Sequence, residues 1–229
     1  MPVQALIRPK AVVFDYGNVL CVSQDRADVE AMAAVFDVPT AQFESVYWRD
    51  RLSFDAAEIT PEAHWATTAA GLSRTLSDAQ RERLIELDNL SWVHPNPIMI
   101  QWAGDLRKAG MRTAVLSNMP ITLRSYLRTC TWLPEFDHSC YSCDVHCAKP
   151  GAEIYRLCLE GLRVKPEDAL FLDDREENIE AARKLGIHTI HFRSPEEAQC
   201  QIDQHYCLPL PIPLAAGGEK LASRSQSSS

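Results

Sequence analysis

Short apolar runs, each bounded by polar residues, recur along this chain. The first covers Ala11 to Phe14 and ends at Asp15, and Gly17-Asn18 marks a turn just behind it. A run of this length suits a strand that is buried on both faces of a sheet. The same pattern predicts three further strands, over residues 112–117, 168–174 and 187–191.

Patterns typical of helices lie between these strands. They cover residues 97–109, 151–162 and 176–185, and a glycine closes the first and the last of them. Strands that alternate with helices predict a parallel sheet covered by helices on both faces. Ligands of such sheets bind beyond the carboxyl ends of the strands. We therefore expect the polar residues at those ends to gather there: Asp15, Ser117, Asp173 and Asp174.

Residues 25–93 break this alternation, because they show only helical patterns. Ser77 to Gln80 form a capping box, and Thr60-Pro61 pairs an N-cap with proline at the first helical position. We interpret 25–93 as a helical cap inserted into a discontinuous core of residues 1–24 and 94–207. The segment 208–229 alternates proline with apolar residues and ends in serines, so we expect a disordered tail.

Composition excludes several classes of function. The net charge of -8 argues against nucleic-acid binding and against attraction to an anionic membrane. No apolar run approaches the roughly 20 residues of a membrane-spanning helix, and Met1 to Lys10 lack a signal-peptide pattern. We therefore expect a cytoplasmic protein whose 8 cysteines are reduced thiols. The oligomeric state is left open.

The polar strand ends form four motifs in a fixed order. They are Phe14-Asp15-Tyr-Gly17-Asn-Val-Leu20, Leu116-Ser117-Asn118, Lys149-Pro150 and Leu172-Asp173-Asp174-Arg-Glu-Glu-Asn178. Together they resemble the haloacid-dehalogenase-like (HAD) superfamily, from about Ala11 to Phe192. The resemblance implies an α/β fold with a Rossmann-like parallel sheet core and an inserted helical cap of the C1 type, as in subfamily IA. The opening motif looks most like that of bacterial sugar-phosphate phosphatases, including α-D-glucose-1-phosphate phosphatases.

The resemblance also implies a chemistry for these motifs. Asp15 would be the nucleophile that forms an aspartyl-phosphate with a small phosphorylated substrate. Lys149 would offset the repulsion between the two anions, while Ser117 and Asn118 hold phosphate oxygens. Mg²⁺ would be bound by Asp15, the Gly17 carbonyl and Asp174, with Asp173 beside them and Asn178 holding a coordinated water. The expected function is a magnesium-dependent phosphomonoester hydrolase.

Gly17 departs from the usual superfamily pattern, which has a second aspartate at this position as general acid and base. Glycine cannot move a proton, and losing that function costs on the order of 10²–10⁴ in rate. The sugar-phosphatase group shows the same glycine, so activity is not excluded. Asp25, at the entry to the cap, is one candidate substitute.

Two further clusters have both a functional and a structural interpretation. Tyr47, Trp48, Arg49 and Arg51 are expected in one cap helix, where they either face the cleft and bind a ring or a second anion, or pack Trp48 inward. Cys140, Cys143 and Cys147 have a spacing that invites a zinc site. No second pair accompanies them, and the resemblance puts a strand and a loop here, so we favour small buried side chains.

Two alternatives to a phosphatase remain. A 2-haloacid dehalogenase also uses an aspartate nucleophile, needs no metal and lacks the second aspartate. The adjacent Asp173 and Asp174 argue against it, because a metal-free site gains nothing from carboxylates that repel each other. A non-catalytic relative that binds a phosphorylated metabolite or a protein is supported only by Gly17.

Overall fold

A computed structural model describes residues 5–212 of the chain. Five parallel strands form one sheet in the order β3-β2-β1-β4-β5. The strands are β1 (Ala11–Phe14), β2 (Arg112–Ser117), β3 (His138–Tyr141), β4 (Ala169–Asp173) and β5 (His188–His191). The predicted α/β Rossmann-like fold class is confirmed, and the four strands predicted from apolar runs are all present.

Strand β3 is the one that the apolar pattern did not mark. It pairs with β2 at the edge of the sheet, from Ala114 opposite His138 to Ser117 opposite Tyr141. Only Cys140 of its residues is buried. An edge strand that is partly exposed tolerates polar side chains, which explains why no apolar run announced it.

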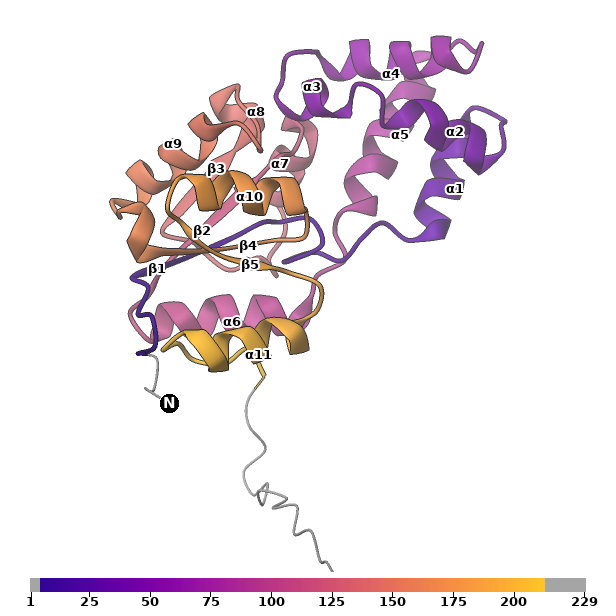
Figure 1. The fold of residues 1–229 in the computed structure, drawn as a ribbon. Helices are drawn as coiled ribbons and strands as arrows, with labels where there is room; N and C mark the ends of the chain where they lie inside the picture. Colours follow the sequence, from indigo (N-terminus) through magenta and orange to yellow (C-terminus); the bar gives the residue numbers. More distant parts are fainter. Residues whose placement is uncertain (1–4, 213–229) are drawn as a thin grey trace, which may run out of the picture.

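Helices cover both faces of the sheet (Figure 1). One face carries α6 (Pro97–Lys108), α7 (Ile121–Leu127) and α11 (Pro195–His205), and the other carries α9 (Ala152–Leu162) and α10 (Glu176–Lys184). Two short helices, α8 (Ser142–Val145) and η1 (Pro166–Asp168), lie in connections. Alternate β1 residues enter opposite layers: Val12 and Phe14 face α6, while Ala11 and Val13 face α9.

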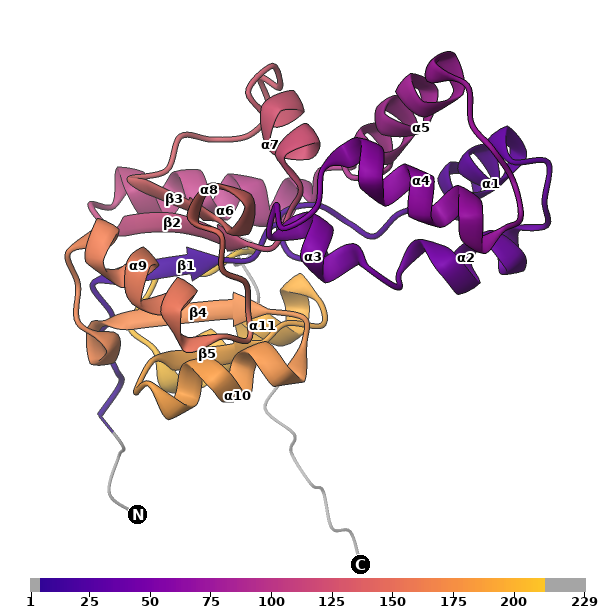
Figure 2. The ribbon, with the colours of Figure 1, turned by 90° about the horizontal axis from the view of Figure 1, so that it is seen from above.

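Five helices between β1 and α6 form a separate body beside the strand ends (Figure 2). These cap helices are α1 (Arg26–Val35), α2 (Thr40–Tyr47), α3 (Arg51–Asp55), α4 (Pro61–Gly71) and α5 (Asp78–Ser91). They share a hydrophobic cluster of their own around Phe43 and Trp65. The expected N-caps are confirmed, since Thr60 caps α4 and Ser77 forms a capping box at α5.

The packed structure extends past residue 207, where the sequence analysis ended the core. Leu208 and Leu210 pack against the core, and Trp102 Nε1 donates a hydrogen bond of 2.8 Å to the Pro209 carbonyl. Residues 208–212 therefore do not belong to a disordered tail. Proline at every second position disfavours both a helix and a central strand, so the pattern did not reveal this contact. The remainder of the predicted tail, 213–229, lies outside the described residues.

No helix within residues 5–212 is both long and apolar enough to cross a membrane.

Candidate active site

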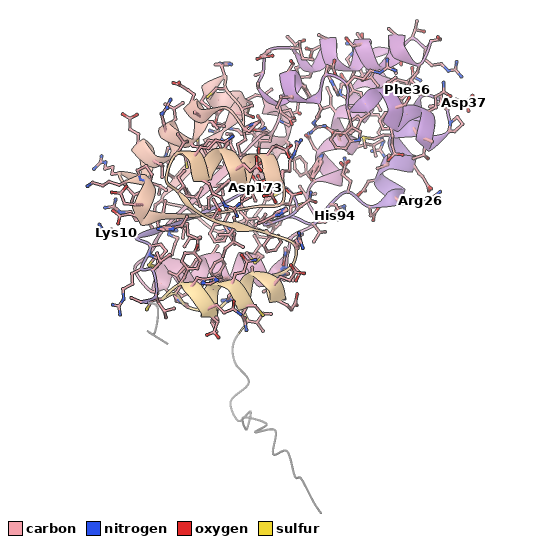
Figure 3. The ribbon with its side chains drawn as sticks, viewed as in Figure 1. Lys10, Arg26, Phe36, Asp37, His94 and Asp173 are labelled. Atoms are coloured by element: carbon pink, nitrogen blue, oxygen red, sulfur yellow. The ribbon has the colours of Figure 1, made fainter. Side chains whose placement is uncertain are left out.

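The register of the sheet brings three of the motifs together. Phe14 pairs with Val115 in β2 and with Leu172 in β4, so the strands end at the same edge. A pocket of about 420 Å³ opens there, between the sheet and the cap helices. Its lining includes most of the predicted site residues: Asp15, Gly17, Ser117, Asn118, Lys149, Asp174 and Asn178. Asp173 is fully buried and is not part of this lining; Figure 3 marks its position.

Lys149 joins two of the carboxylates at the base of the pocket. Its Nζ lies 2.8 Å from Asp15 Oδ1 and 2.6 Å from Asp173 Oδ2. The residue is only 2% exposed. Burial by itself disfavours the charged ammonium, but Asp15 and Asp173 outweigh that effect and raise the pKa of Lys149. Lys149 is therefore a fixed positive charge beneath the pocket.

Asp173 is saturated by hydrogen bonds from the protein. Its Oδ1 accepts from the Arg175 backbone N–H at 2.9 Å and from Asn178 Nδ2 at 2.9 Å, and its Oδ2 accepts from Asn178 Nδ2 at 3.0 Å. Lys149 Nζ is a further donor to Oδ2. Asp173 thus orients Lys149, and Asn178 orients Asp173.

Asp15 differs from Asp173 in having one oxygen that is less occupied. Its Oδ1 accepts from the Tyr16 backbone N–H at 2.7 Å and pairs with Lys149. Its Oδ2 accepts no hydrogen bond from the described residues. Burial raises the pKa of the Asp15 carboxyl to about 7, with Lys149 opposing this rise and Asp173 adding to it. A cation at this site would stabilise the ionised form of Asp15.

Carboxylate oxygens of Asp15, Asp173 and Asp174 all lie within 4.8 Å of one another. Burial, together with the charge of Asp173, raises the pKa of Asp174, although Asn18 Nδ2 donates to it at 2.8 Å and opposes the rise. Hard divalent cations such as Mg²⁺ prefer oxygen ligands of this kind. The donor set therefore fits magnesium, and the one nearby lysine leaves negative charge for a cation to balance.

Asn118 ties the second motif to the third. Its Nδ2 donates to the Lys149 carbonyl at 2.9 Å, and its Oδ1 accepts from the Lys149 backbone N–H at 2.9 Å. Ser117, at the end of β2, is 3% exposed and lines the pocket beside them. The reciprocal bonds hold the Ser117-Asn118 loop and the Lys149 backbone in one fixed arrangement.

Gly17 has no steric need to be glycine. Its φ is not in the left-handed region, and a Cβ there would meet Trp92 only at an ordinary contact distance of 3.5 Å. Asp25, the substitute acid considered from the sequence, is exposed and caps α1 through a capping box with Asp28. Asp28 also pairs with His94, at the junction of cap and core (Figure 3). Asp25 does not line the pocket.

The aromatic and basic cluster of the cap is divided by the structure. The expectation of one helix is wrong, because α2 ends at Tyr47 and α3 begins at Arg51. No glycine or proline marks this break in the sequence. Tyr47 is buried, whereas Trp48 is 49% exposed and lines the pocket together with Leu52.

Arg51 lines the pocket but is buried, and two carboxylates of the cap already pair with its guanidinium. Its Nε lies 2.8 Å from Asp55 Oδ1 and its Nη1 lies 2.9 Å from Asp88 Oδ1. Asp55 lines the pocket, and the sequence analysis did not single it out. It lies in no recognisable motif, and only the packing of α3 against the core brings it to the site.

The cysteines near β3 are consistent with a structural interpretation. Cys140 and Cys143 are buried and Cys147 is partly buried. Burial raises the pKa of Cys140 to about 12 and that of Cys143 to about 11, which suppresses the thiolate that binds metals. Within the described residues, this trio is not among the clusters with metal-binding geometry.

Known proteins share both sequence and fold with this chain. "Acyl-CoA dehydrogenase family member 10" of Mus musculus is 36% identical over 50% of the chain, and "Bifunctional epoxide hydrolase 2" of Rattus norvegicus is 33% identical over 52%. The chain spans only 11% and 23% of those proteins. "Phosphatase MT3486" of Mycobacterium tuberculosis is 26% identical, over 77% of the chain and 84% of the relative.

Two solved structures illustrate the shared fold. A HAD family enzyme of Bacteroides thetaiotaomicron, crystallised with magnesium and inorganic phosphate, has a TM-score of 0.64 and 22% identity, over 81% of this chain and 94% of that one. An L-2-haloacid dehalogenase of Xanthobacter autotrophicus has a TM-score of 0.61 and 20% identity, over 89% and 86%. The family model for haloacid dehalogenase-like hydrolases matches residues 9–186, well over half of the sequence. The chain therefore belongs to the haloacid dehalogenase-like hydrolases.

Proposed function

We propose that this protein is a magnesium-dependent phosphomonoester hydrolase that acts on a small phosphorylated metabolite through an aspartyl-phosphate on Asp15. The observation that carries the proposal is the position of Lys149, which bridges Asp15 and Asp173 beside Asp174 at the base of an open pocket. A relative named as a phosphatase and a structural neighbour that binds magnesium and phosphate support it.

Asp15 is the nucleophile in this proposal because its carboxylate follows β1 into the pocket, is paired with Lys149, and keeps one oxygen free of hydrogen bonds from the described residues. Its Oδ2 attacks phosphorus while Oδ1 stays bonded to Lys149 and to the Tyr16 N–H. The Lys149 charge reduces the repulsion between the attacking carboxylate and the phosphate. Ser117 and the Asn118 backbone, which line the same pocket, hold phosphate oxygens.

The carboxylates of Asp15 and Asp174, with the Gly17 carbonyl, would hold the magnesium ion. When bound, the ion supplies positive charge that stabilises the transferring phosphoryl group. The oxygens of Asp173 are occupied by protein donors. We therefore propose that Asp173 acts mainly by positioning Lys149, and that Asn178, which donates to Asp173, supports the same arrangement together with a coordinated water.

The dehalogenase alternative has weaker support. The likeness to the Xanthobacter enzyme concerns the fold alone, at 20% identity. Three carboxylates within 4.8 Å are costly unless a cation balances them. The finer expectation, a sugar phosphate as substrate, rests on the short Asp15-x-Gly17-Asn18-Val19 motif and remains part of the proposal.

A phosphate-release screen over many phosphomonoesters tests this function. Wild-type protein with Mg²⁺ should release phosphate, and EDTA should abolish the release. Asp15→Asn should fold and be inactive, because an amide is a poor nucleophile. The control Asp203→Asn alters an exposed carboxylate on α11 and should retain full activity. Full activity in EDTA, or turnover by Asp15→Asn above a few per cent of wild type, would contradict the proposal.

A further inference from the structure

One buried carboxylate of the pocket has no part in the mechanism proposed above. Asp55 ends α3 and lines the pocket that also contains Asp15, Gly17 and Lys149. Its side chain is 12% exposed. Gly17 leaves the reaction without the usual proton donor, so an acid in the same pocket is chemically significant.

A hydrogen-bonded link fixes Asp55 to the phosphate-binding side of the core. The Asp55 carbonyl accepts a hydrogen bond from Ser142 Oγ in α8. The same Oγ accepts from the Met119 backbone N–H at 3.0 Å, and Met119 follows directly on Ser117 and Asn118. The position of Asp55 is thus set by the core as well as by the cap, and this link uses its backbone rather than its carboxylate.

The surroundings of Asp55 favour a proton on it. Asp55 and Asp88 share the single guanidinium of Arg51. Asp88 also accepts a hydrogen bond from the Tyr47 hydroxyl and lies outside the pocket lining, so Asp55 is the one of the two that faces the pocket. Burial raises the pKa of Asp55 to about 6, with Arg51 opposing, Asp88 adding to the rise, and Arg175 opposing from the β4 side.

The other acids of the pocket already have roles in the proposed mechanism. Among the described residues the lining contains three carboxylates, those of Asp15, Asp55 and Asp174. The first is the proposed nucleophile and the third a proposed metal ligand. Asp55 is the one with no role in that mechanism. Arg51 holds its Oδ1, while its Oδ2 takes no hydrogen bond from the described residues.

We propose that Asp55 is the general acid and base of this enzyme, in place of the aspartate that Gly17 lacks. This inference rests on the proposed function. As the Asp15–phosphorus bond forms and the ester P–O bond breaks, the protonated Asp55 carboxyl gives its proton to the departing ester oxygen, which leaves as an alcohol. The Asp55 carboxylate then takes a proton from the water that attacks the aspartyl-phosphate, and inorganic phosphate leaves with Asp15 and Asp55 restored.

The test is the dependence of kcat/KM on leaving-group pKa, measured with a series of aryl and alkyl phosphates. An alkoxide leaving group needs a proton far more than a phenoxide, so wild type should show a shallow slope. Asp55→Asn should lower kcat/KM for alkyl phosphates on the order of 10²–10⁴ and change that for nitrophenyl phosphate only several-fold. The control Glu58→Gln replaces an exposed acid three residues away and should keep the wild-type slope.

Three results would overturn the inference. These are a steep slope in wild type, an equal loss by Asp55→Asn for all esters, and no loss for alkyl phosphates. The wild-type slope needs no variant, so the test stands even if Asp55→Asn folds poorly. Failure of the proposed function looks different, since wild type would then release no phosphate from any ester with Mg²⁺. Beryllium fluoride with Mg²⁺ should still raise the Tm of Asp55→Asn, because this mimic of the aspartyl-phosphate needs no proton donor.

Discussion

The two walls of the pocket differ in how much apolar surface they expose. On the core wall, charged residues bond one another, and Lys149 and Asp173 are 2% and 0% exposed. The cap wall also contains a buried ion pair, between Arg51 and Asp55, but its Trp48 and Leu52 are 49% and 53% exposed. The core wall is fixed by its own contacts before a substrate arrives, whereas the cap wall has apolar surface that only a bound molecule would cover. We infer that the core holds the proposed nucleophile and metal ligands, while the exposed apolar part of the cap selects the substrate.

Lys149→Met is expected to have the largest effect on stability and activity, because it removes the central ion pairs of the core wall. Removing the lysine leaves Asp15 and Asp173 buried without their cation, which costs about 3–5 kcal/mol of unfolding free energy. Phosphate release should fall by at least about 10²–10³. Denaturant melts and turnover assays measure both, with Lys184→Met, an exposed position on α10, as control. Retention of wild-type turnover by Lys149→Met would show that the bridge does not take part in the chemistry.

Asp174→Ala is expected to have the second-largest effect, on Mg²⁺ affinity and turnover. The carboxylate lines the pocket with Asn18 as its partner. Its loss should weaken Mg²⁺ affinity at least about 10- to 100-fold, the loss typical of a residue that only orients a metal ligand. Isothermal titration with Mg²⁺ measures this directly, and turnover should recover partly at high Mg²⁺. Unchanged Mg²⁺ affinity would remove Asp174 from the proposed metal site.

Trp48→Ala tests the cap wall. We expect KM for a substrate with an aromatic or apolar group to rise about 10-fold, equivalent to 1.4 kcal/mol, with a smaller change in kcat. The free energy of unfolding should fall by about 1 kcal/mol, because the buried half of the side chain packs on Tyr47 and Trp92. Leu6→Ala, another exposed apolar position but outside the pocket, is the control. Equal KM values in wild type and Trp48→Ala would contradict the assignment of selection to this wall.

The smallest expected effect is a pH dependence of stability caused by His64. It should affect the cap and not the core. His64 is fully buried, stacks on Phe54 at 4.3 Å, and its Nε2 has no hydrogen-bond partner in the described residues. Burial lowers the pKa of His64 below its usual 6.5, although Asp50 opposes this. The unfolded state then binds the proton more tightly, so the cap should lose stability as pH falls below about 6.5 and lose none above it.

Amide hydrogen exchange in α4, compared at pH 7.5 and pH 5.5, measures this effect. The protection factors of these amides, which correct for the slower intrinsic exchange at low pH, should fall at pH 5.5 in wild type and much less in His64→Gln, which cannot take up the proton. Strands β1 and β4 serve as the internal reference. An equal fall in both proteins would place the acid sensitivity elsewhere.

The sequence predicted the core better than the cap for a physical reason. Asp15, Ser117 and Asp174 follow short buried strands, and parallel pairing alone brings strand ends together. Short sequence patterns are therefore enough to predict that these residues lie close together. The fifth strand, β3, has one buried residue and gave no apolar signal.

The cap wall depends on packing that no short pattern encodes. Tyr47 and Arg51 looked like neighbours on one helix, but the chain turns between them and both become buried. Asp55 reaches the pocket because α3 docks on α8 through Ser142, a contact across 87 positions of sequence. Asp25 had the right residue type near the right place, yet it is used to cap α1.

The crowding of carboxylates around Lys149 also affects the stability of the folded protein. One ammonium faces three carboxylates, so the empty site holds like charges together at a cost in folding free energy. Stability and activity are commonly opposed in this way at catalytic sites. An inactive Asp15→Asn protein should therefore melt at a higher temperature than the metal-free wild type. Without a bound cation, the repulsion at this site would lower the free energy of unfolding of the whole protein. Binding of a cation would recover that lost stability.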